Sequence, residues 1–197
     1  MTKHSRNKPH DQSFSAASLG VDSTIVLVGL MGVGKTTVGR RLAKKLGLGF
    51  VDSDHEIEQA ADMTVGEIFE KYGEDDFRSG ERRVIARLLD DTPQVVATGG
   101  GAFINDETRK LIKREGISIW LDADVNILVE RTSRRDTRPL LKNGDPKEIL
   151  ARLSTERTPY YAQADLKVVS SDGSHDHVVN AIIEALMERN EKKIRNA

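Results

Sequence analysis

A short glycine-rich segment carries the residue types best suited to holding phosphate. Residues 29–36 read GLMGVGKT and fit the pattern G-x-x-x-x-G-K-[S/T], in which successive backbone N–H groups surround the oxygens of an anion. In such a loop, Lys35 would reach the β- and γ-phosphates of a nucleotide, and the Thr36 hydroxyl would bind Mg²⁺. A glycine-rich turn without a ligand is the alternative. The segment predicts a nucleotide cradle formed by Gly32, Val33, Gly34, Lys35, Thr36 and Thr37.

Two carboxylates follow at a spacing that suits phosphoryl transfer. Asp52 and Asp54 lie two residues apart at the end of an apolar run, and residues i and i+2 of an extended chain point to the same side. Asp52 could hold the water shell of Mg²⁺, and Asp54 could accept a proton from an attacking hydroxyl. A structural alternative is equally open, in which Ser53 and Glu56 form a capping box and Asp54 lies in the first turn of a helix.

Three glycines and two arginines are further candidates for ligand contact. Gly99, Gly100 and Gly101 follow another apolar run, where they would let a ligand approach the backbone, although an ordinary flexible turn would also explain them. Arg78 stands among acidic residues and could simply pair with one of them. Arg157, in the sequence RTPYY, is equally ambiguous on its own.

A basic segment at residues 132–146 has the composition of a lid. Long connections in compact domains are often lids, and a basic one would close over phosphates and exclude water during transfer. A solvated basic loop is the alternative. The residues that give the segment this character are Arg134, Arg135, Arg138 and Lys142, together with Gly144 and Pro146.

Alternating elements must position these groups. Apolar runs at 24–28, 49–52, 94–98, 117–121 and 166–169 predict strands, and amphipathic patterns such as 124–134 predict helices between them. Strands separated by helices imply a parallel sheet, and ligands bind such sheets at the carboxyl ends of the strands. We therefore predict an α/β fold of three layers, with a central parallel sheet of about five strands flanked by helices, and a lid loop. A closing helix is predicted from the apolar face of Val178, Val179, Ile182, Ile183 and Leu186.

Composition narrows the class of protein. The chain has 197 residues, enough for one domain, and its net charge of −1 provides no overall field to attract nucleic acid or an anionic membrane. It has no cysteine, which excludes disulfides and cysteine chemistry, and no apolar run approaches the roughly 20 residues of a membrane span. We expect a cytoplasmic protein with a disordered tail at 1–22, a folded domain at 23–189 and a frayed end at 190–197.

Taken together, these motifs resemble those of shikimate kinases. They are GLMGVGKTT, DSD, FR, TGGGA, RPLL and RTPYY, and their order and spacing match that family from about residue 24 to residue 183. The resemblance implies a P-loop kinase of the nucleoside-monophosphate-kinase type. Such an enzyme transfers the γ-phosphate of ATP to the 3-hydroxyl of shikimate in aromatic amino-acid biosynthesis. The implied partners are ATP with one Mg²⁺ ion and shikimate, without nucleic acid or membrane, and the implied state is a monomer.

The resemblance also implies which residues contact the nucleotide. Lys35 binds phosphate, and Thr36 coordinates Mg²⁺ with Asp52 in the outer shell of the ion. Arg138 of the lid reaches the transferring phosphate, and Arg131 stacks on adenine. Residues 170–174 read SSDGS and lack a proline that some relatives carry nearby, so the sequence does not specify the rest of the adenine wall.

On the acceptor side, the resemblance assigns the remaining candidates. Asp54 holds the hydroxyl groups of shikimate and is the candidate base. Arg78 and Arg157 grip its carboxylate, a role for which the planar guanidinium fork is better suited than lysine. The residues that line the substrate pocket are Gly99, Gly100 and Gly101.

Two other functions compete with this interpretation. A gluconate-type kinase would share the fold and the phosphate loop, but it should not need Arg78 and Arg157 together with the DSD and GGG motifs. A nucleotide-binding regulatory protein would transfer phosphate to nothing. The presence of Asp54, Arg78 and the lid arginine argues against that second alternative.

Overall fold

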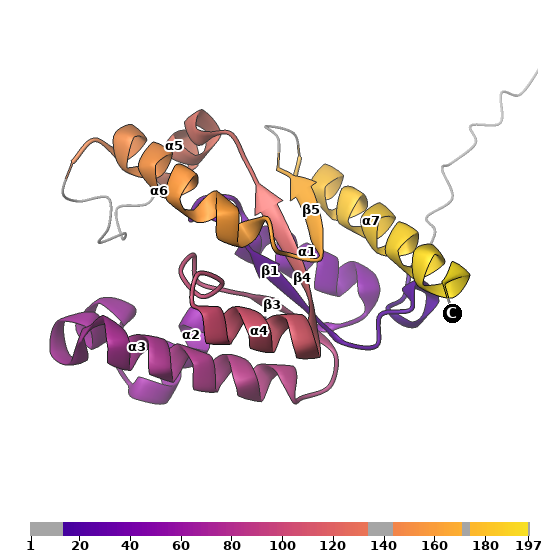
Figure 1. Cartoon of the computed structure of the whole chain (residues 1–197), viewed down its shortest axis with the longest axis horizontal. Coiled ribbons are helices and arrows are strands. Elements are labelled where there is room, and N and C mark those ends of the chain that lie inside the picture. The colour runs from indigo at the N-terminus through magenta and orange to yellow at the C-terminus, as the bar shows by residue number, and fades with distance from the viewer. Residues whose placement is uncertain (1–13, 134–143, 171–173, 197) are drawn as a thin grey trace, which may run out of the picture.

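The computed structural model describes residues 14–133, 144–170 and 174–196, and a parallel sheet forms its centre (Figure 1). The strands pair in the order β2-β3-β1-β4-β5, and every pairing is parallel. Each strand lies where the sequence predicts one, although β3 ends one residue earlier than expected. The predicted α/β architecture is confirmed. The strands are β1 (Thr24–Val28), β2 (Gly49–Asp52), β3 (Gln94–Ala97), β4 (Gly116–Asp122) and β5 (Leu166–Val169).

The central strands are apolar on both faces. Every residue of β1 and β3 is buried, as expected for parallel strands that helices cover on both sides. Leu27 pairs with Ala97 in the neighbouring strand, so the carboxyl ends of β1 and β3 meet at one edge of the sheet. Beyond β3, the backbone N–H and the hydroxyl of Thr98 both donate to the carbonyl oxygen of Leu27, at 3.2 and 3.0 Å. The segment after β3 is thereby held beside the phosphate loop.

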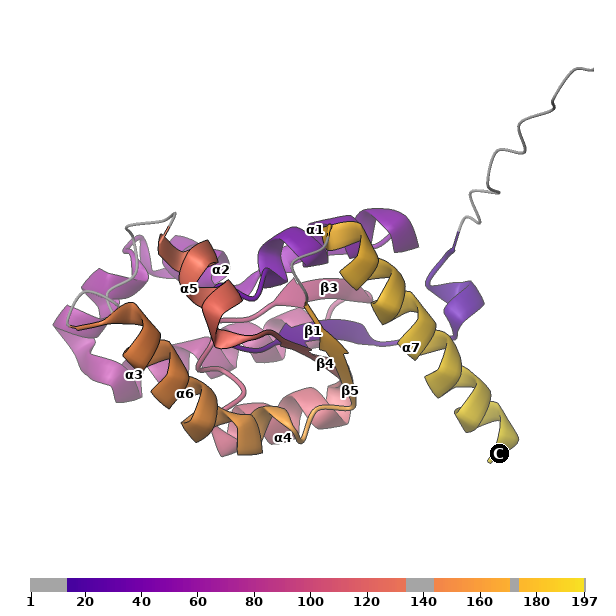
Figure 2. The same cartoon turned by 90° about the horizontal axis from the view of Figure 1, so that it is seen from above.

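Helices cover both faces of the sheet (Figure 2). On one face, α1 (Lys35–Leu46) packs against β1, β2 and β3, and α7 (His175–Arg195) packs against β5 and α1. On the other face lie α3 (Val65–Leu89) and α4 (Asp106–Glu115), with α4 against β4. Across the described ranges, no helix combines the length and the apolar character needed to cross a membrane.

Two further helices stand at the carboxyl edge of the sheet. They are α5 (Val125–Ser133) and α6 (Pro146–Tyr161), which pack against each other. Asp145 caps α6 by accepting a hydrogen bond from the backbone of Lys147. The predicted lid segment at 132–146 therefore begins within α5 and ends at the first residue of α6. The residues between them, 134–143, lie outside the described part of the chain.

A smaller hydrophobic cluster lies apart from the main one. Ile57 of α2 (Ser53–Ala61) packs with Ile68 and Phe77 of α3, whereas the main cluster surrounds the sheet. The helix α3 is interrupted at Gly73, where φ is 80° and ψ is 177°, a conformation that residues with a Cβ rarely adopt. The chain thus bends just before the part of α3 that carries Arg78.

Both ends of the folded domain extend further than the sequence predicts. Leu19 and Val21 are buried in the main cluster, although residues 1–22 are expected to form a disordered tail, and the short 3-10 helix Ala17–Leu19 packs against α7. At the other end, α7 continues to Arg195 instead of fraying from residue 190. A few apolar residues are enough to pack the amino-terminal segment onto the domain, because α7 provides a surface for them. Residues 1–13 and 197 lie outside the part of the chain that the structure describes.

Replacing Leu19 by alanine tests the packing of the amino-terminal segment. Leu19 is 3% exposed, so Leu19→Ala should lower the free energy of unfolding by about 2–5 kcal/mol. Ile194→Ala at the same end of the molecule is the matched control, because Ile194 is 67% exposed and its truncation should cost less than about 0.5 kcal/mol. Urea unfolding of the two variants measures both effects. Equal midpoints for Leu19→Ala and wild type would show that the segment is not packed.

Candidate active site

The phosphate loop joins β1 to α1 at the carboxyl edge of the sheet. Gly34 precedes α1 with φ at 99°, a left-handed conformation that favours glycine. Leu30 and Val33 are buried, so apolar side chains anchor the loop in the core. Lys35 Nζ donates hydrogen bonds to the carbonyl oxygens of Gly29 and Leu30, at 2.7 and 2.9 Å. The lysine therefore lies beside the amino-terminal end of a helix, where backbone N–H groups attract anions.

Asp52 connects the end of β2 to two helices. Its Oδ2 accepts a hydrogen bond from Thr36 Oγ1 at 2.8 Å, and its Oδ1 accepts one from the backbone N–H of Asp54 at 3.2 Å. Asp52 keeps an extended backbone and is the N-cap of α2. The capping box considered for Ser53 and Glu56 is therefore wrong, since the helix already begins at Ser53 and the cap lies one residue earlier.

Asp54 is a half-buried carboxylate close to this pair. Burial raises the pKa of Asp54 above its ordinary value of 3.8, and the negative charge of Asp52 raises it further, while Lys35 opposes the rise. A carboxylate with a raised pKa is a stronger proton acceptor than an ordinary aspartate. Asp54 therefore has the electrostatic surroundings of a general base.

Arg78 is held by two carboxylates of its own helix. Its Nη1 donates to Glu81 Oε2 at 2.7 Å, and its Nε and Nη2 donate to Glu74 Oε1 at 3.3 and 3.2 Å. The Glu81 side chain is only 1% exposed, and burial raises the pKa of Glu81 to about 6 although Arg78 opposes the rise. From the sequence, Glu81 is only one of several acidic neighbours of Arg78. Its position three residues after Arg78 is the one signal that could have identified it.

The three consecutive glycines bring these charged groups to one place. A Cβ added at Gly99 would lie 2.6 Å from Asp54 Oδ1 and 3.2 Å from Glu81 Oε1, and one added at Gly101 would overlap the guanidinium of Arg78. The sequence suggests that the glycines admit a ligand to the backbone. In the structure they admit the charged side chains of the protein itself.

The carbonyl oxygen of Gly100 is a second meeting point. Arg157 Nη1 donates to this oxygen at 3.1 Å, and the Tyr161 hydroxyl donates to it at 2.5 Å. Both side chains come from the last turns of α6. Burial raises the pKa of Tyr161, so its hydroxyl keeps its proton and remains a donor. Tyr161 therefore holds the carbonyl group of Gly100 in place, a role that the sequence did not indicate.

A separate polar group lies on the other side of the phosphate loop. Arg131 Nη1 donates to Ser170 Oγ at 3.1 Å and to the carbonyl oxygen of Val33 at 3.4 Å. The imidazole of His175 lies 3.7 Å from the position of a Cβ at Gly34, and burial together with Arg131 lowers the pKa of His175. These residues come from the β4–β5 half of the fold, whereas the acceptor candidates come from the β2–β3 half and α6. The phosphate loop therefore stands between the two groups.

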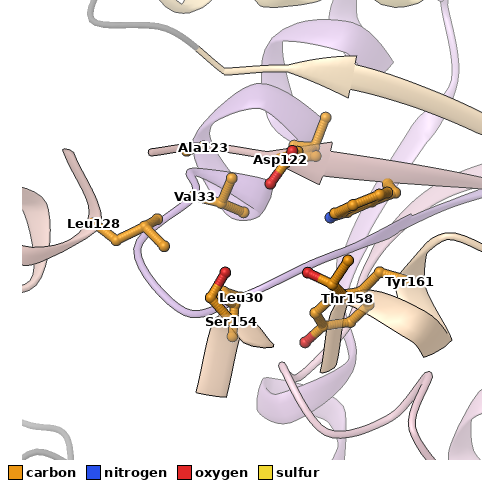
Figure 3. A pocket seen from close by; sticks show the side chains of 10 residues that line it. Leu30, Val33, Asp122, Ala123, Leu128, Ser154, Thr158 and Tyr161 are labelled. Atoms are coloured by element: carbon orange, nitrogen blue, oxygen red, sulfur yellow. The ribbon is translucent and has the colours of Figure 1, made fainter. Parts of the chain in front are cut away.

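A cavity beneath the loop is too small to be a substrate site (Figure 3). Its volume is about 10 Å³, which is room for a single water molecule. This cavity therefore has no room for a sugar-sized or nucleotide-sized ligand. Among the lining residues are Leu30, Val33, Asp122, Ser154, Thr158 and Tyr161.

Most of the predicted site residues lie along this edge. Arg131 is separated from the acceptor candidates by the phosphate loop, Thr37 follows Thr36 in the first turn of α1, and Arg138 lies outside the described residues. The roles assigned to all of them stay predictions. The residues that surround the edge are Lys35, Thr36, Asp52, Asp54, Arg78, Gly99, Gly100, Gly101 and Arg157.

Comparison with known proteins identifies the family to which the chain belongs. A family model described as shikimate kinase matches residues 31–187. A shikimate kinase from Bradyrhizobium diazoefficiens is 56% identical over 170 residues, which is 86% of this chain and 82% of the relative.

Among solved structures, one is similar to this chain in both sequence and fold, and another is similar in fold alone. Shikimate kinase from Acinetobacter baumannii in complex with shikimate superposes with a TM-score of 0.83 at 38% identity, over 88% of this chain and 98% of that chain. A gluconokinase from Sinorhizobium meliloti reaches a TM-score of 0.61 at only 19% identity, over 89% of this chain and 98% of that one, which is a likeness of fold alone. The chain therefore belongs to the shikimate kinase family, a family of ATP-dependent kinases.

Proposed function

We propose that this site transfers the γ-phosphoryl group of ATP to the 3-hydroxyl of shikimate, giving ADP and shikimate 3-phosphate. The observation that carries the proposal is the approach of Asp54, Arg78 and Arg157 to a single glycine turn beside the phosphate loop. Shikimate has one carboxylate and neighbouring hydroxyl groups. A pair of arginines and an aspartate are matching partners for these groups.

On the nucleotide side, Lys35 exchanges its bonds to loop carbonyls for bonds to phosphate oxygens. Its charge then opposes the negative charge that develops during transfer. Thr36 would bind Mg²⁺ through its hydroxyl oxygen, and Asp52, which lies 2.8 Å from that hydroxyl, would hold the water shell of the ion, because Mg²⁺ prefers hard oxygen ligands and keeps several waters. The ion, when bound, neutralises charge on the β- and γ-phosphates. Arg131, beside Ser170, contacts the adenine.

On the acceptor side, Asp54 receives the proton of the attacking hydroxyl. The hydroxyl oxygen forms a bond to the γ-phosphorus while the bond from that phosphorus to the bridging oxygen of ADP breaks. The raised pKa of Asp54 suits this proton transfer. Arg78 and Arg157 hold the carboxylate of shikimate at the other end of the molecule, which orients the hydroxyl toward the phosphate. Glu74 and Glu81 fix the guanidinium of Arg78 in place.

An ADP-release assay with alternative acceptors tests the function directly. We expect turnover with shikimate and none above background with gluconate or nucleoside monophosphates. Lys35→Ala should lower the turnover number by at least about 10²-fold because it removes a preorganised positive charge at the phosphates. Lys44→Ala, an exposed position on the same helix, is the matched control and should leave turnover unchanged. Preferred turnover of gluconate would point to the rival kinase, and nucleotide binding without ADP release for any acceptor would point to a regulatory nucleotide-binding protein.

Asp54→Asn should separate catalysis from helix capping. Loss of a positioned base costs about 10²–10⁴ in rate, whereas the affinity for ATP should stay close to that of wild type. Asparagine caps helices about as well as aspartate, and Asp52 is already the cap, so the fold should survive. Steady-state kinetics and nucleotide titration measure the two quantities. Unchanged turnover would mean that Asp54 is not the base.

The pH profile gives a second measure of the same residue. Because Asp54 must be unprotonated to act, kcat/KM should fall as the pH drops through a pKa above the ordinary value of 3.8. Glu81 titrates nearby, with a pKa of about 6. Glu81→Gln removes that group and is the control, since the acid limb should persist in this variant if Asp54 causes it and should disappear if Glu81 does.

Arg78→Lys or Arg157→Lys should weaken the binding of shikimate but not the binding of ATP. Each replacement keeps the charge but loses the planar fork, at a cost of roughly 1.5–3 kcal/mol, or one to two decades in affinity. The affinity for ATP should hardly change. The double variant should lose less than the sum of the single losses if both arginines grip one carboxylate.

An acceptor analogue with a neutral amide in place of the carboxylate is the control for this pair. Wild type should discriminate strongly between acid and amide, and Arg78→Lys or Arg157→Lys should discriminate much less. If wild type accepts the amide as well as the acid, the two arginines do not recognise the carboxylate.

A further inference from the structure

Arg109 of α4 is a buried arginine that bridges three segments of the chain. Its side chain is 9% exposed. Nη1 donates to the carbonyl oxygens of Phe103 and Ile104 at 3.1 and 3.0 Å, and Nη2 donates to Asp106 Oδ1 at 2.7 Å. Nε donates to Gln163 Oε1 at 3.1 Å. Four of its N–H bonds are therefore committed, and only a planar guanidinium can supply donors in so many directions.

Apart from Asp106 of its own helix, the partners of Arg109 belong to the two segments that meet at Gly100. Phe103 and Ile104 end the turn that begins with the three glycines. Gln163 lies two residues after the end of α6, and the guanidinium is also 5.3 Å from the ring of Tyr160 in the last turn of α6. The same turn and the same helix are joined again at Gly100, whose carbonyl oxygen accepts from Arg157 and Tyr161. The turn and the end of α6 are thus joined at two places, by the bonds of Arg109 and by the bonds to the carbonyl oxygen of Gly100.

This double attachment matters because the glycines add no side-chain contacts to the backbone bonds of the turn. Consecutive glycines lose more backbone entropy on ordering than other residues, and they have no side chains to pack. The arginine pair also comes from two different helices, Arg78 from α3 and Arg157 from α6. The spacing between their guanidinium groups therefore depends on contacts that tie α6 to the turn.

We propose that Arg109 is a positioning residue of the acceptor site, which fixes Arg157 and Gly100 relative to each other through its bonds to the turn and to the end of α6. The proposal rests on the proposed function, because it takes Arg157 as a ligand of the acceptor carboxylate. Arg109 itself touches no substrate. Its effect should therefore fall on acceptor binding and leave the nucleotide site intact.

The chain carries a built-in probe for acceptor binding. Trp120 is its only tryptophan, and its ring stacks on Tyr161 with centroids 6.0 Å apart, so the indole adjoins the residue that holds Gly100. Titration of tryptophan fluorescence with shikimate gives a dissociation constant without turnover. Steady-state kinetics gives the KM for ATP from the same preparations.

Arg109→Lys is the main variant, because lysine keeps the charge beside Asp106 but cannot reach both carbonyls and Gln163 at once. We expect the dissociation constant for shikimate to rise about tenfold, with the KM for ATP within about twofold of wild type. Gln163→Leu changes an exposed residue and removes both the bond from Arg109 and the bond that Gln163 Nε2 donates to the carbonyl oxygen of Pro159 in α6. It should raise the shikimate constant about two- to tenfold. This second variant decides the question if Arg109→Lys does not fold.

Two controls separate positioning from general stability. Arg114→Lys changes an exposed arginine on the same helix, which pairs with Glu115, and should have no effect. Leu186→Ala opens the core at a residue of α7 that is 2% exposed, so it should lower stability without changing the ratio of the two constants. If Arg109→Lys and Gln163→Leu lower stability but bind shikimate as wild type does, or if both constants rise together, the proposal is wrong. If wild type itself does not bind shikimate, the proposed function fails instead.

Discussion

Close contact between charged side chains and a backbone without side chains is the constraint on which this site depends. At Gly99 and Gly101 the space that a Cβ would occupy is taken by Asp54, Glu81 and Arg78. Carboxylates and guanidinium groups in so small a volume compensate one another, and the removal of one partner leaves an unpaired charge at high cost. The raised pKa of Glu81 shows the limit of this compensation, since burial outweighs the attraction of Arg78. Larger residues in the turn would separate charges that stabilise one another.

The sequence predicts the framework of the site well, for clear physical reasons. Buried strands leave continuous apolar runs in the sequence. The predicted bounds of these runs nearly match the observed bounds of the strands. Because parallel strands end at the same edge, the segments that follow Val28, Val51 and Thr98 are expected to meet, and they do. The phosphate loop is local in sequence, so its pattern alone indicates the strand-to-helix turn.

Contacts that depend on packing between distant segments could not be predicted in this way. Glu81 looks like any acidic residue of a charged helix until α3 buries it against the glycine turn. Tyr161 and Arg109 act across α6, the turn and α4, whose relative placement no local pattern encodes. The amino-terminal segment was misjudged because its polar composition hides Leu19 and Val21, which the surface of α7 covers. Asp52 replaced Ser53 as the cap because the helix begins one residue earlier than the capping pattern suggests.

The division of the apolar residues into two clusters has a consequence for ligands of this protein. Asp54 and Arg78 lie in the parts of α2 and α3 that build the small cluster of Ile57, Ile68 and Phe77, although the end of α3 also reaches the main cluster, to which α1 and α6 belong. Regions packed in different clusters can differ in local stability. A molecule that engages Arg78 and Arg157 together acts as a cross-link between these regions, and part of its interaction energy is spent on ordering them. For an inhibitor, a rigid length that matches the span between the clusters therefore matters more than added contacts within either one.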